Sequence, residues 1–106
     1  MTGIYTQQDL INYMTPVLKK YPITRGGLFG SYARHEQAAT SDVDLIIDKT
    51  PDTAIGILNI IVELEDLLGI PVDIIFYSQL ESQKDIKYHG SFRDRVKNEV
   101  IWFYEA

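Results

Sequence analysis

The stretch FGSYARHEQAATSDVDLIID, residues 29–48, carries most of the information about the fold, because it joins a glycine-serine turn to an aliphatic segment that opens with two aspartates. The aliphatic residues predict a largely buried β-strand over residues 42–48. Side chains alternate faces along a strand, so Asp42 and Asp44 point to the same side, with Cα atoms roughly 6 to 7 Å apart. Ionised carboxylates held away from water need a countercharge such as a metal ion, so the pair indicates a functional site.

Two elements are predicted before this strand. Thr6 and Asp9 have the spacing of a capping box, and the apolar residues that follow recur at helical spacing until Tyr21. Residues 23–29 have the composition of another strand, which a glycine-serine turn ends. A short helix is expected to start at Ser31.

A longer helix is predicted after the aspartate-bearing strand, starting at Thr50 and ending at Gly69. Its core-facing stripe is expected to consist of Ala54, Ile57, Leu58, Ile61, Leu64 and Leu68. Ile60 and Leu67 fall on the opposite, polar side. Isolated exposed aliphatic residues are common, but this pair is also a candidate contact with a protein partner.

The C-terminal third predicts two more strands and a helix. Residues 72–76 form a third strand that carries Asp73, and residues 77–90 are polar and expected to form a loop or short helix. A capped helix is predicted over residues 91–98, after which residues 100–104 either form a last strand or continue the helix. This order of elements indicates an α/β (α+β) fold, with a small mixed β-sheet flanked by helices.

The composition limits the classes of function. The chain is 45% hydrophobic, enough for one core, so residues 1–106 are expected to form a single domain. A net charge of −5 offers no broad basic surface, so direct nucleic-acid binding is not expected. The absence of cysteine excludes disulfides and thiolate metal sites. Without a signal-peptide pattern or a segment long enough to cross a bilayer, the protein is expected to be cytoplasmic, with no membrane partner.

A cluster of three carboxylates is predicted where two strands lie side by side. Asp73 lies one residue inside its strand, and a lateral spacing of roughly 5 Å would let it join Asp42 and Asp44. Three carboxylates on one patch repel each other unless divalent cations lie among them, and oxygen-only ligands favour Mg²⁺ or Mn²⁺ over zinc.

An anion site is predicted next to these carboxylates, at the strand-to-helix turn. Gly30 lets a phosphate approach the backbone, and the N–H groups of a helix N-terminus together with the Ser31 hydroxyl offer donors. Arg34, one turn further, can reach the same phosphates. A phosphate site beside a metal cluster suits phosphoryl or nucleotidyl transfer, because two cations can stabilise the attacking and leaving oxygens together.

Two other motifs fail on specific residues. A P-loop needs a lysine and a hydroxyl residue after its last glycine, but Gly30 is followed by Ser31 and Tyr32. A calcium loop that starts at Asp42 would need glycine where Ile47 stands. Both motifs are therefore excluded.

Other charged residues have ordinary structural interpretations. Asp48 lies at the far end of its strand and is interpreted as a turn residue, and His35 and His89 as polar surface residues. A solvated helix face, which a triphosphate or an acidic partner could also use, is predicted for Arg93, Arg95 and Lys97.

The spacing of the turn and the aspartates forms the pattern G-S-x10-D-x-D, with GSYAR at its start and SDVDL at its end. This pattern resembles the minimal nucleotidyltransferases of the DNA polymerase beta superfamily. The resemblance covers nearly the whole chain, because the helix, strand, turn, D-x-D strand, helix and third-aspartate strand follow the family's order. It implies the nucleotidyltransferase fold and transfer of a nucleoside monophosphate from ATP to an acceptor hydroxyl, with two Mg²⁺ ions bound (Mn²⁺ as a substitute) and pyrophosphate released.

The resemblance also implies roles for single residues. Asp42 and Asp44 would ligate the metals, and Asp73 would ligate the catalytic metal and accept the proton of the acceptor hydroxyl. Gly30 and Ser31 would hold the β- and γ-phosphates.

Many short proteins of this kind are similar to antitoxins that are encoded beside a ribonuclease toxin with a HEPN (higher-eukaryote-and-prokaryote nucleotide-binding) domain. The resemblance implies adenylylation of a tyrosine of that toxin, and a hetero-oligomer of the two proteins. One alternative is a non-catalytic antitoxin that neutralises the toxin by binding and occlusion. Another is nucleotide transfer to a small molecule, which would need a substrate-binding domain that is not evident in this chain.

Overall fold

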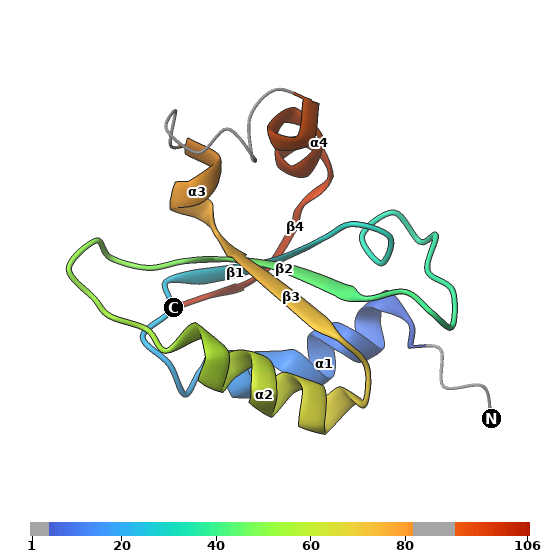
Figure 1. Cartoon of the computed structure of the whole chain (residues 1–106), viewed down its shortest axis with the longest axis horizontal. Helices are drawn as coiled ribbons and strands as arrows, with labels where there is room; N and C mark the ends of the chain where they lie inside the picture. The colour runs from blue at the N-terminus through green and yellow to red at the C-terminus, as the bar shows by residue number, and fades with distance from the viewer. Residues whose placement is uncertain (1–4, 82–90) are drawn as a thin grey trace.

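The computed structural model describes residues 5–81 and 91–106, which form a four-stranded mixed sheet with helices on both faces (Figure 1). In chain order the elements are α1 (Gln7–Leu18), β1 (Arg25–Phe29), β2 (Val43–Asp48), α2 (Ile57–Leu68), β3 (Val72–Phe76), α3 (Tyr77–Glu81), α4 (Ser91–Glu99) and β4 (Ile101–Glu105). The predicted fold class is confirmed. Within the described ranges, no helix is long and apolar enough to span a membrane.

The sheet has the strand order β3-β2-β1-β4. β1 pairs antiparallel with β2 and β4, whereas β2 pairs parallel with β3. The register places Asp44 opposite Asp73 on β3 and opposite Phe29 at the end of β1. The two aspartate-bearing strands are therefore neighbours, and the chain that leaves β1 for the glycine-serine turn passes beside Asp44.

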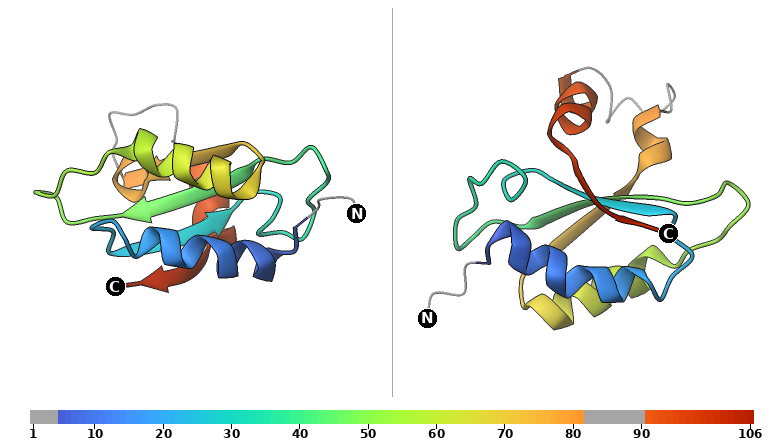
Figure 2. Two further views of the ribbon diagram at one scale, coloured as in Figure 1. Left: turned by 90° about the horizontal axis from the view of Figure 1, so that it is seen from below. Right: turned by 180° about the vertical axis from the view of Figure 1, so that it is seen from behind.

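Each face of the sheet packs against two helices. α1 and α2 lie side by side under one face, and α3 and α4 lie over the other (Figures 1 and 2). The larger core, between the sheet and the first helix pair, includes the fully buried Leu45 and Ile47 of β2. The smaller core on the other face consists of Phe29, Ile46, Ile75, Leu80 and Val96. Because strand side chains alternate faces, Asp44 shares the face of Ile46 and of the smaller core.

The start of α1 confirms the predicted capping box. The Thr6 hydroxyl accepts a hydrogen bond from the Asp9 amide at 3.0 Å, and the Asp9 carboxylate accepts one from the Thr6 amide at 3.0 Å. The helix ends at Leu18, three residues before the predicted end, because the amides of Lys20 and Tyr21 bond to carbonyls three residues back and tighten the chain into a turn.

The predicted start of the second long helix was wrong, and its predicted stripe was right for Ile57, Ile61, Leu64 and Leu68 only. α2 begins at Ile57, because the chain after β2 first makes a turn in which the Thr53 amide donates to the Thr50 carbonyl. Ile60, predicted on the polar side, is 0% exposed, whereas Leu58, predicted in the core stripe, is 72% exposed. Residues two apart on a helix point in nearly opposite directions, so the two cannot both face the core. Ala54 lies exposed before the helix.

Other predictions about these C-terminal elements agree with the structure. Leu67 is 46% exposed, and Gly69 ends α2 in the left-handed conformation at φ 73°. The segment after β3 begins with the short helix α3, and the rest of it, residues 82–90 with His89, lies outside the described residues. After α4, the last element is a strand rather than a longer helix.

The short helix predicted at Ser31 is a single turn instead. The Arg34 amide donates to the Gly30 carbonyl at 3.2 Å, and the Glu36 amide donates to the Ser31 carbonyl at 2.9 Å. Between these bonds His35 adopts a positive φ of 58°, which reverses the chain and prevents a second helical turn.

Candidate active site

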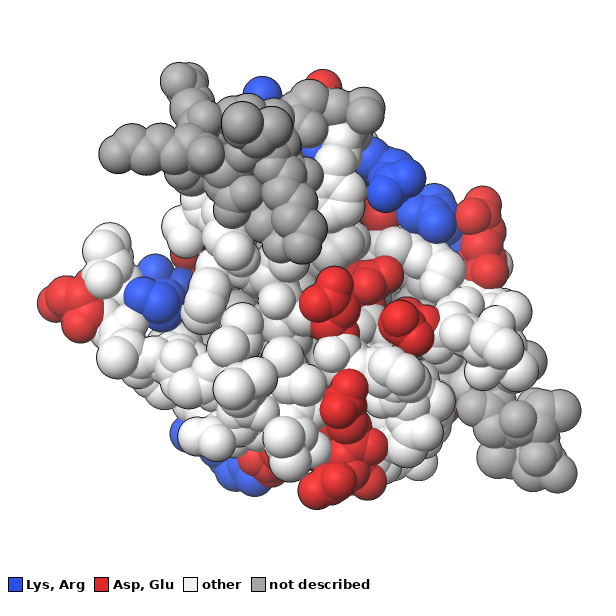
Figure 3. All heavy atoms as spheres, viewed as in Figure 1, with Lys and Arg blue, Asp and Glu red and all other residues white. Residues whose placement is uncertain are grey.

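All six residues predicted from the sequence line one cavity, with a volume of about 500 Å³, beside the first residues of β2 and β3. They are Asp42, Asp44, Asp73, Gly30, Ser31 and Arg34. Asp42 precedes β2 by one residue and is exposed, Asp44 is half-buried on β2, and Asp73 is exposed on the edge strand β3. In the view of Figure 3, acidic side chains gather near the middle of the molecule, and basic side chains lie at its upper right edge.

Asp44 lies where negative charge accumulates. The pKa of its carboxyl group is raised to about 6, chiefly by burial and further by the neighbouring charges of Asp73, Asp42 and Glu99, with partial opposition from Arg34. Without a bound metal ion, the positive charge near the Asp44 carboxylate is therefore too small to balance the surrounding negative charge.

The chemistry of these side chains fits a hard divalent cation. Within residues 5–81 and 91–106, no three acidic or histidine side chains already converge as a complete ligand set. However, Asp42, Asp44 and Asp73 line the same cavity, and the raised pKa of Asp44 results in part from their mutual repulsion. Carboxylate oxygens are the ligands that Mg²⁺ and Mn²⁺ prefer, and a cation among them would relieve the repulsion.

Gly30 is required by its surroundings on two grounds. Its φ of 79° is one that other residues rarely adopt. A Cβ at this position would lie 2.2 Å from the Asp44 Oδ2 atom, far inside contact distance. Only glycine therefore lets the turn pass directly against the Asp44 carboxylate.

The donors at the turn differ from those predicted. Because no helix starts at Ser31, the expected helix N-terminus is absent from this position, and the prediction of a helix-dipole anion site was wrong. The Gly30 amide already donates to Glu99 Oε2, at 2.5 Å. In the described part of the chain, the Ser31 amide and hydroxyl have no hydrogen-bond partner, so they are the donors that the turn leaves available.

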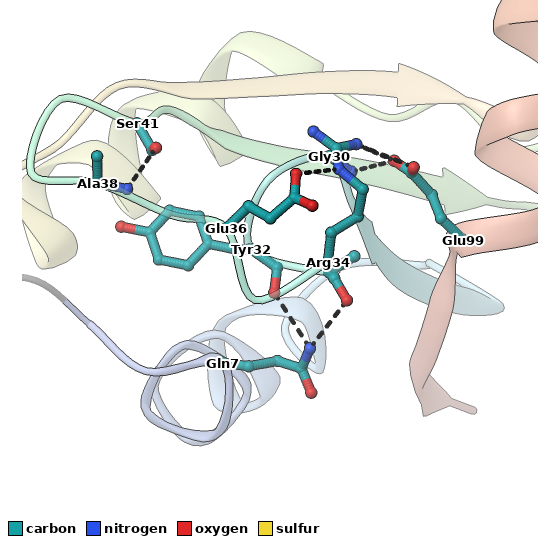
Figure 4. Close-up of polar contacts among 9 residues, drawn as sticks. Gln7, Gly30, Tyr32, Arg34, Glu36, Ala38, Ser41 and Glu99 are labelled. Atoms are coloured by element: carbon teal, nitrogen blue, oxygen red, sulfur yellow. Dashed lines mark hydrogen bonds and ion pairs between the residues drawn. The ribbon is translucent and has the colours of Figure 1, made fainter.

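Arg34 reaches the cavity from the end of the turn and is held by two carboxylates. Its Nε donates to Glu36 Oε1 at 3.0 Å, and its Nη1 donates to Glu99 Oε1 at 2.9 Å (Figure 4). These bonds raise the pKa of the guanidinium group, with the Glu36 contribution the larger. The arginine remains a cation next to the aspartates.

Helix α4 contributes a wall of the site that the sequence analysis largely missed. Phe92 and Arg95 line the cavity, and Glu99 contacts Gly30 and Arg34 behind it. Their spacing of three and four residues places them on one face of the helix. Arg95 belongs to the basic set already noted, whereas Glu99 lies one residue beyond the helix predicted over residues 91–98, and no local sequence signal marked it.

Other charged residues lie apart from the cavity. Asp48 accepts a hydrogen bond from the Arg25 Nε at 3.4 Å, at the opposite end of β2. His35 is exposed, and its ring nitrogen lies 3.4 Å from the Gln7 side-chain nitrogen. Arg93 is half-exposed and does not line the cavity. Asp48 and His35 were also predicted to lie outside the site.

Comparison with known proteins identifies relatives along most of the chain. The family model described as "Nucleotidyltransferase domain" matches residues 13–103. A predicted protein adenylyltransferase of Methanocaldococcus jannaschii is 33% identical over 87 residues, which cover 81% of this chain and 85% of that protein. The protein adenylyltransferase MntA of Thermococcus cleftensis is 34% identical over 65 residues, covering 60% of this chain and 66% of that one.

Solved structures share the fold at lower sequence identity. A chain of a toxin–antitoxin complex with AMP-PNP superposes with a TM-score of 0.68 at 19% identity, over 91% of this chain and 73% of that one. A chain from the complex of tri-AMPylated Shewanella oneidensis HEPN toxin with MNT antitoxin gives 0.61 at 18% identity, over 95% of this chain and 74% of that one. With the family model matching residues 13–103 and relatives named as protein adenylyltransferases, the chain belongs to the nucleotidyltransferase domain family.

Proposed function

We propose that this nucleotidyltransferase transfers AMP from ATP to a tyrosine hydroxyl of a HEPN-domain ribonuclease toxin and thereby acts as its antitoxin. One observation carries the proposal: three carboxylates, a glycine-serine turn and an arginine line a single cavity. The transfer breaks the bond between the α-phosphorus and the oxygen that bridges to the β-phosphate. A new bond joins the α-phosphorus to the hydroxyl oxygen, and pyrophosphate leaves.

The residues divide this work between a metal site and a phosphate site. Asp42, Asp44 and Asp73 would hold Mg²⁺, which would neutralise charge on the triphosphate and on the leaving pyrophosphate. Ser31 and Arg34 would bind the β- and γ-phosphates, Ser31 with its amide and hydroxyl and Arg34 with its guanidinium. Catalysis in such a site depends mainly on positioning and charge stabilisation.

Asp73 has the position that suits a general base. It lies on the edge strand β3 and is exposed, so an acceptor hydroxyl can approach it from solvent. Its carboxylate would take the hydroxyl proton as the new bond forms. The acceptor then needs to present only one side chain to the cavity.

The choice of acceptor rests on relatives. Relatives are named as protein adenylyltransferases, and one structural neighbour is a complex whose HEPN toxin is tri-AMPylated. Because Asp73 is exposed at the cavity, a protein partner would present its tyrosine from solvent.

The test is a labelling experiment with the product of the neighbouring gene. That product, if it is a helical protein with an R-x4-H motif, is incubated with the nucleotidyltransferase, Mg²⁺ and ATP labelled at the α-phosphate. The wild type is expected to label the partner on tyrosine, and the Asp42→Asn/Asp44→Asn variant to lose labelling by about 100-fold or more, because removal of groups that stabilise transition-state charge costs this much. Equal labelling by both proteins would end the catalytic proposal.

The same variant separates catalysis from occlusion. If transfer neutralises the toxin, cells that carry the toxin lose protection when the double asparagine variant replaces the wild type, even where the two proteins still co-purify. Protection by the variant at wild-type level would instead support the non-catalytic alternative.

A further inference from the structure

Glu99 stands out among the charged residues of the molecule because it is nearly buried and touches two residues of the cavity without lining it. Only 11% of its side chain is exposed, and it lies at the C-terminal end of α4. We propose that Glu99 is a positioning residue for the triphosphate: it fixes the Gly30 turn and orients Arg34 so that the remaining guanidinium donors face the cavity. The inference rests on the proposed function, because the triphosphate is the substrate of that function.

The carboxylate of Glu99 accepts three hydrogen bonds from two donor groups of one short segment. Oε2 accepts the Gly30 amide at 2.5 Å, and Arg34 Nη1 donates to Oε1 at 2.9 Å and to Oε2 at 3.2 Å (Figure 4). Hydrogen bonds to an ionised carboxylate are stronger than neutral ones, and the low exposure of Glu99 reduces screening by water at its end of the pair, whereas the Arg34 side chain is 36% exposed. One side chain on α4 therefore holds both ends of the turn that follows β1.

The consequence for Arg34 is a fixed guanidinium plane. Nε is engaged by Glu36 and Nη1 by Glu99, and in the described part of the chain Nη2 has no partner. A guanidinium presents its donors in a rigid planar fork, so holding two nitrogens sets the direction of the third. Since Arg34 lines the cavity, the free edge is positioned for a phosphate before any nucleotide arrives.

The two carboxylates that hold Arg34 are not equivalent. The Glu36 side chain is 65% exposed, whereas that of Glu99 is 11% exposed and also holds the Gly30 amide. The Glu36 hydrogen bond is the larger cause of the raised Arg34 pKa, but at this exposure water and salt screen an ion pair and reduce its contribution to stability. Glu36 therefore offers a comparison with the same charge, the same partner and a weaker expected effect.

The first test measures MgATP binding by calorimetry. Glu99→Gln keeps the size of the side chain but removes its charge, so it should raise the dissociation constant about tenfold through loss of the charge-assisted hold on Arg34. Glu36→Gln should raise it about twofold or less. In turnover, Glu99→Gln should raise the KM for ATP while kcat changes less, because a positioned phosphate donor contributes to binding of both substrate and transition state.

A double-mutant cycle tests whether Glu99 acts through Arg34. In the Arg34→Ala background, Glu99→Gln should cause little further loss of MgATP affinity, because the group that it orients is gone. Additive losses would overturn the inference, as would wild-type affinity in Glu99→Gln. Tighter binding by Glu99→Gln would overturn it as well, since it would mean that Glu99 competes with phosphate for these donors.

A metal-free and nucleotide-free measurement keeps the inference testable if Glu99→Gln fails to fold or if ATP does not bind. In the NMR spectrum of the wild-type protein without ligands, the Arg34 Nη1–H resonances, whose group donates to Glu99, should exchange slowly with water, and Glu99→Gln should accelerate that exchange more than tenfold. Rapid exchange in the wild type would overturn the inference on its own. Wild-type protein that shows slow exchange but no MgATP binding would instead count against the proposed function.

Discussion

Strand β2 carries an aspartate near each end on the same face of the sheet, and the two lie in opposite electrostatic surroundings. At the far end, Asp48 pairs with Arg25, whose guanidinium lies 3.8 Å above the Trp102 ring centroid and 4.8 Å from that of Tyr77. At the near end, Asp44 is flanked by other acids, and its pKa is raised to about 6 by burial and by their charge. The charge of Asp48 is neutralised by Arg25, whereas the charge of Asp44 has no comparable partner among the described residues.

The register of the sheet explains the difference. On β1, Arg25 stands opposite Asp48, whereas Phe29 stands opposite Asp44, and on β3 the neighbour of Asp44 is another acid, Asp73. The far end is therefore a structural ion pair with aromatic packing. The near end keeps an excess of negative charge, which Arg34 offsets only in part. A buried charge without its countercharge lowers stability, which is a cost that functional sites commonly carry.

The largest effect is expected at the turn beside Asp44. Gly30→Ala would place a Cβ 2.2 Å from Asp44 Oδ2 and force a positive φ on alanine, so it should lower the free energy of unfolding by about 3 kcal/mol or more. Gly69→Ala is the matched control, because Gly69 has a similar φ of 73° but nothing within 4 Å of the added atom. The control should lose only about 1 kcal/mol. Urea denaturation measures both, and equal losses would contradict the close packing of the turn against the carboxylate.

Asparagine at the two ends of β2 should have opposite effects on the metal-free protein. At pH 7.5 with EDTA, Asp44→Asn should raise the Tm by about 4 °C, a shift that corresponds to roughly 1 kcal/mol in a chain of this size, because it removes an uncompensated charge. Asp48→Asn should lower it by a smaller amount, since the Arg25 pair is partly exposed. Thermal unfolding followed by circular dichroism tests this pair of shifts. A fall in Tm for Asp44→Asn would show that the near end is already neutralised.

The pH dependence of stability provides a smaller effect with a defined sign. The folded-state pKa of Asp44, about 6, lies above its ordinary value of 3.8. Between these values the folded state binds more protons than the unfolded state, so this residue makes the free energy of unfolding fall as pH rises from about 4 to about 6. The difference between wild type and Asp44→Asn isolates this contribution from those of the other carboxylates. A difference that stays constant from pH 4 to pH 7 would exclude the raised pKa.

Much of the fold and the site could be predicted because their signals are local in sequence. The D-x-D pair, the aliphatic run of β2 and the glycine that ends α2 are each signals carried by a few consecutive residues. The start of α2 was misplaced because Thr50, Pro51 and Asp52 have the composition of a helix start, but form a turn when β2 and α2 are packed on the sheet.

The part that was missed depends on contacts between distant segments. Glu99 bonds to Gly30 and Arg34 across separations of 69 and 65 residues, and nothing local marks it as a partner of the turn. The loss of the expected helix at Ser31 has a similar origin, since the positive φ of His35 follows from the path that the loop takes back to β2. Sequence patterns predicted where the carboxylates lie. The packing of α4 against the turn, which adds Phe92, Arg95 and Glu99 to the site, could not be predicted from them.

The most direct test of a cation-dependent triphosphate site at the near end of β2 is titration calorimetry of ATP into the protein with and without Mg²⁺. Wild type should bind ATP with Mg²⁺ present and lose at least about tenfold in affinity when EDTA replaces it, because the carboxylates then repel the triphosphate. Asp42→Asn/Asp44→Asn should remove the Mg²⁺ dependence, while Asp48→Asn should retain it. Equal ATP affinity with and without Mg²⁺ in the wild type would contradict the assignment.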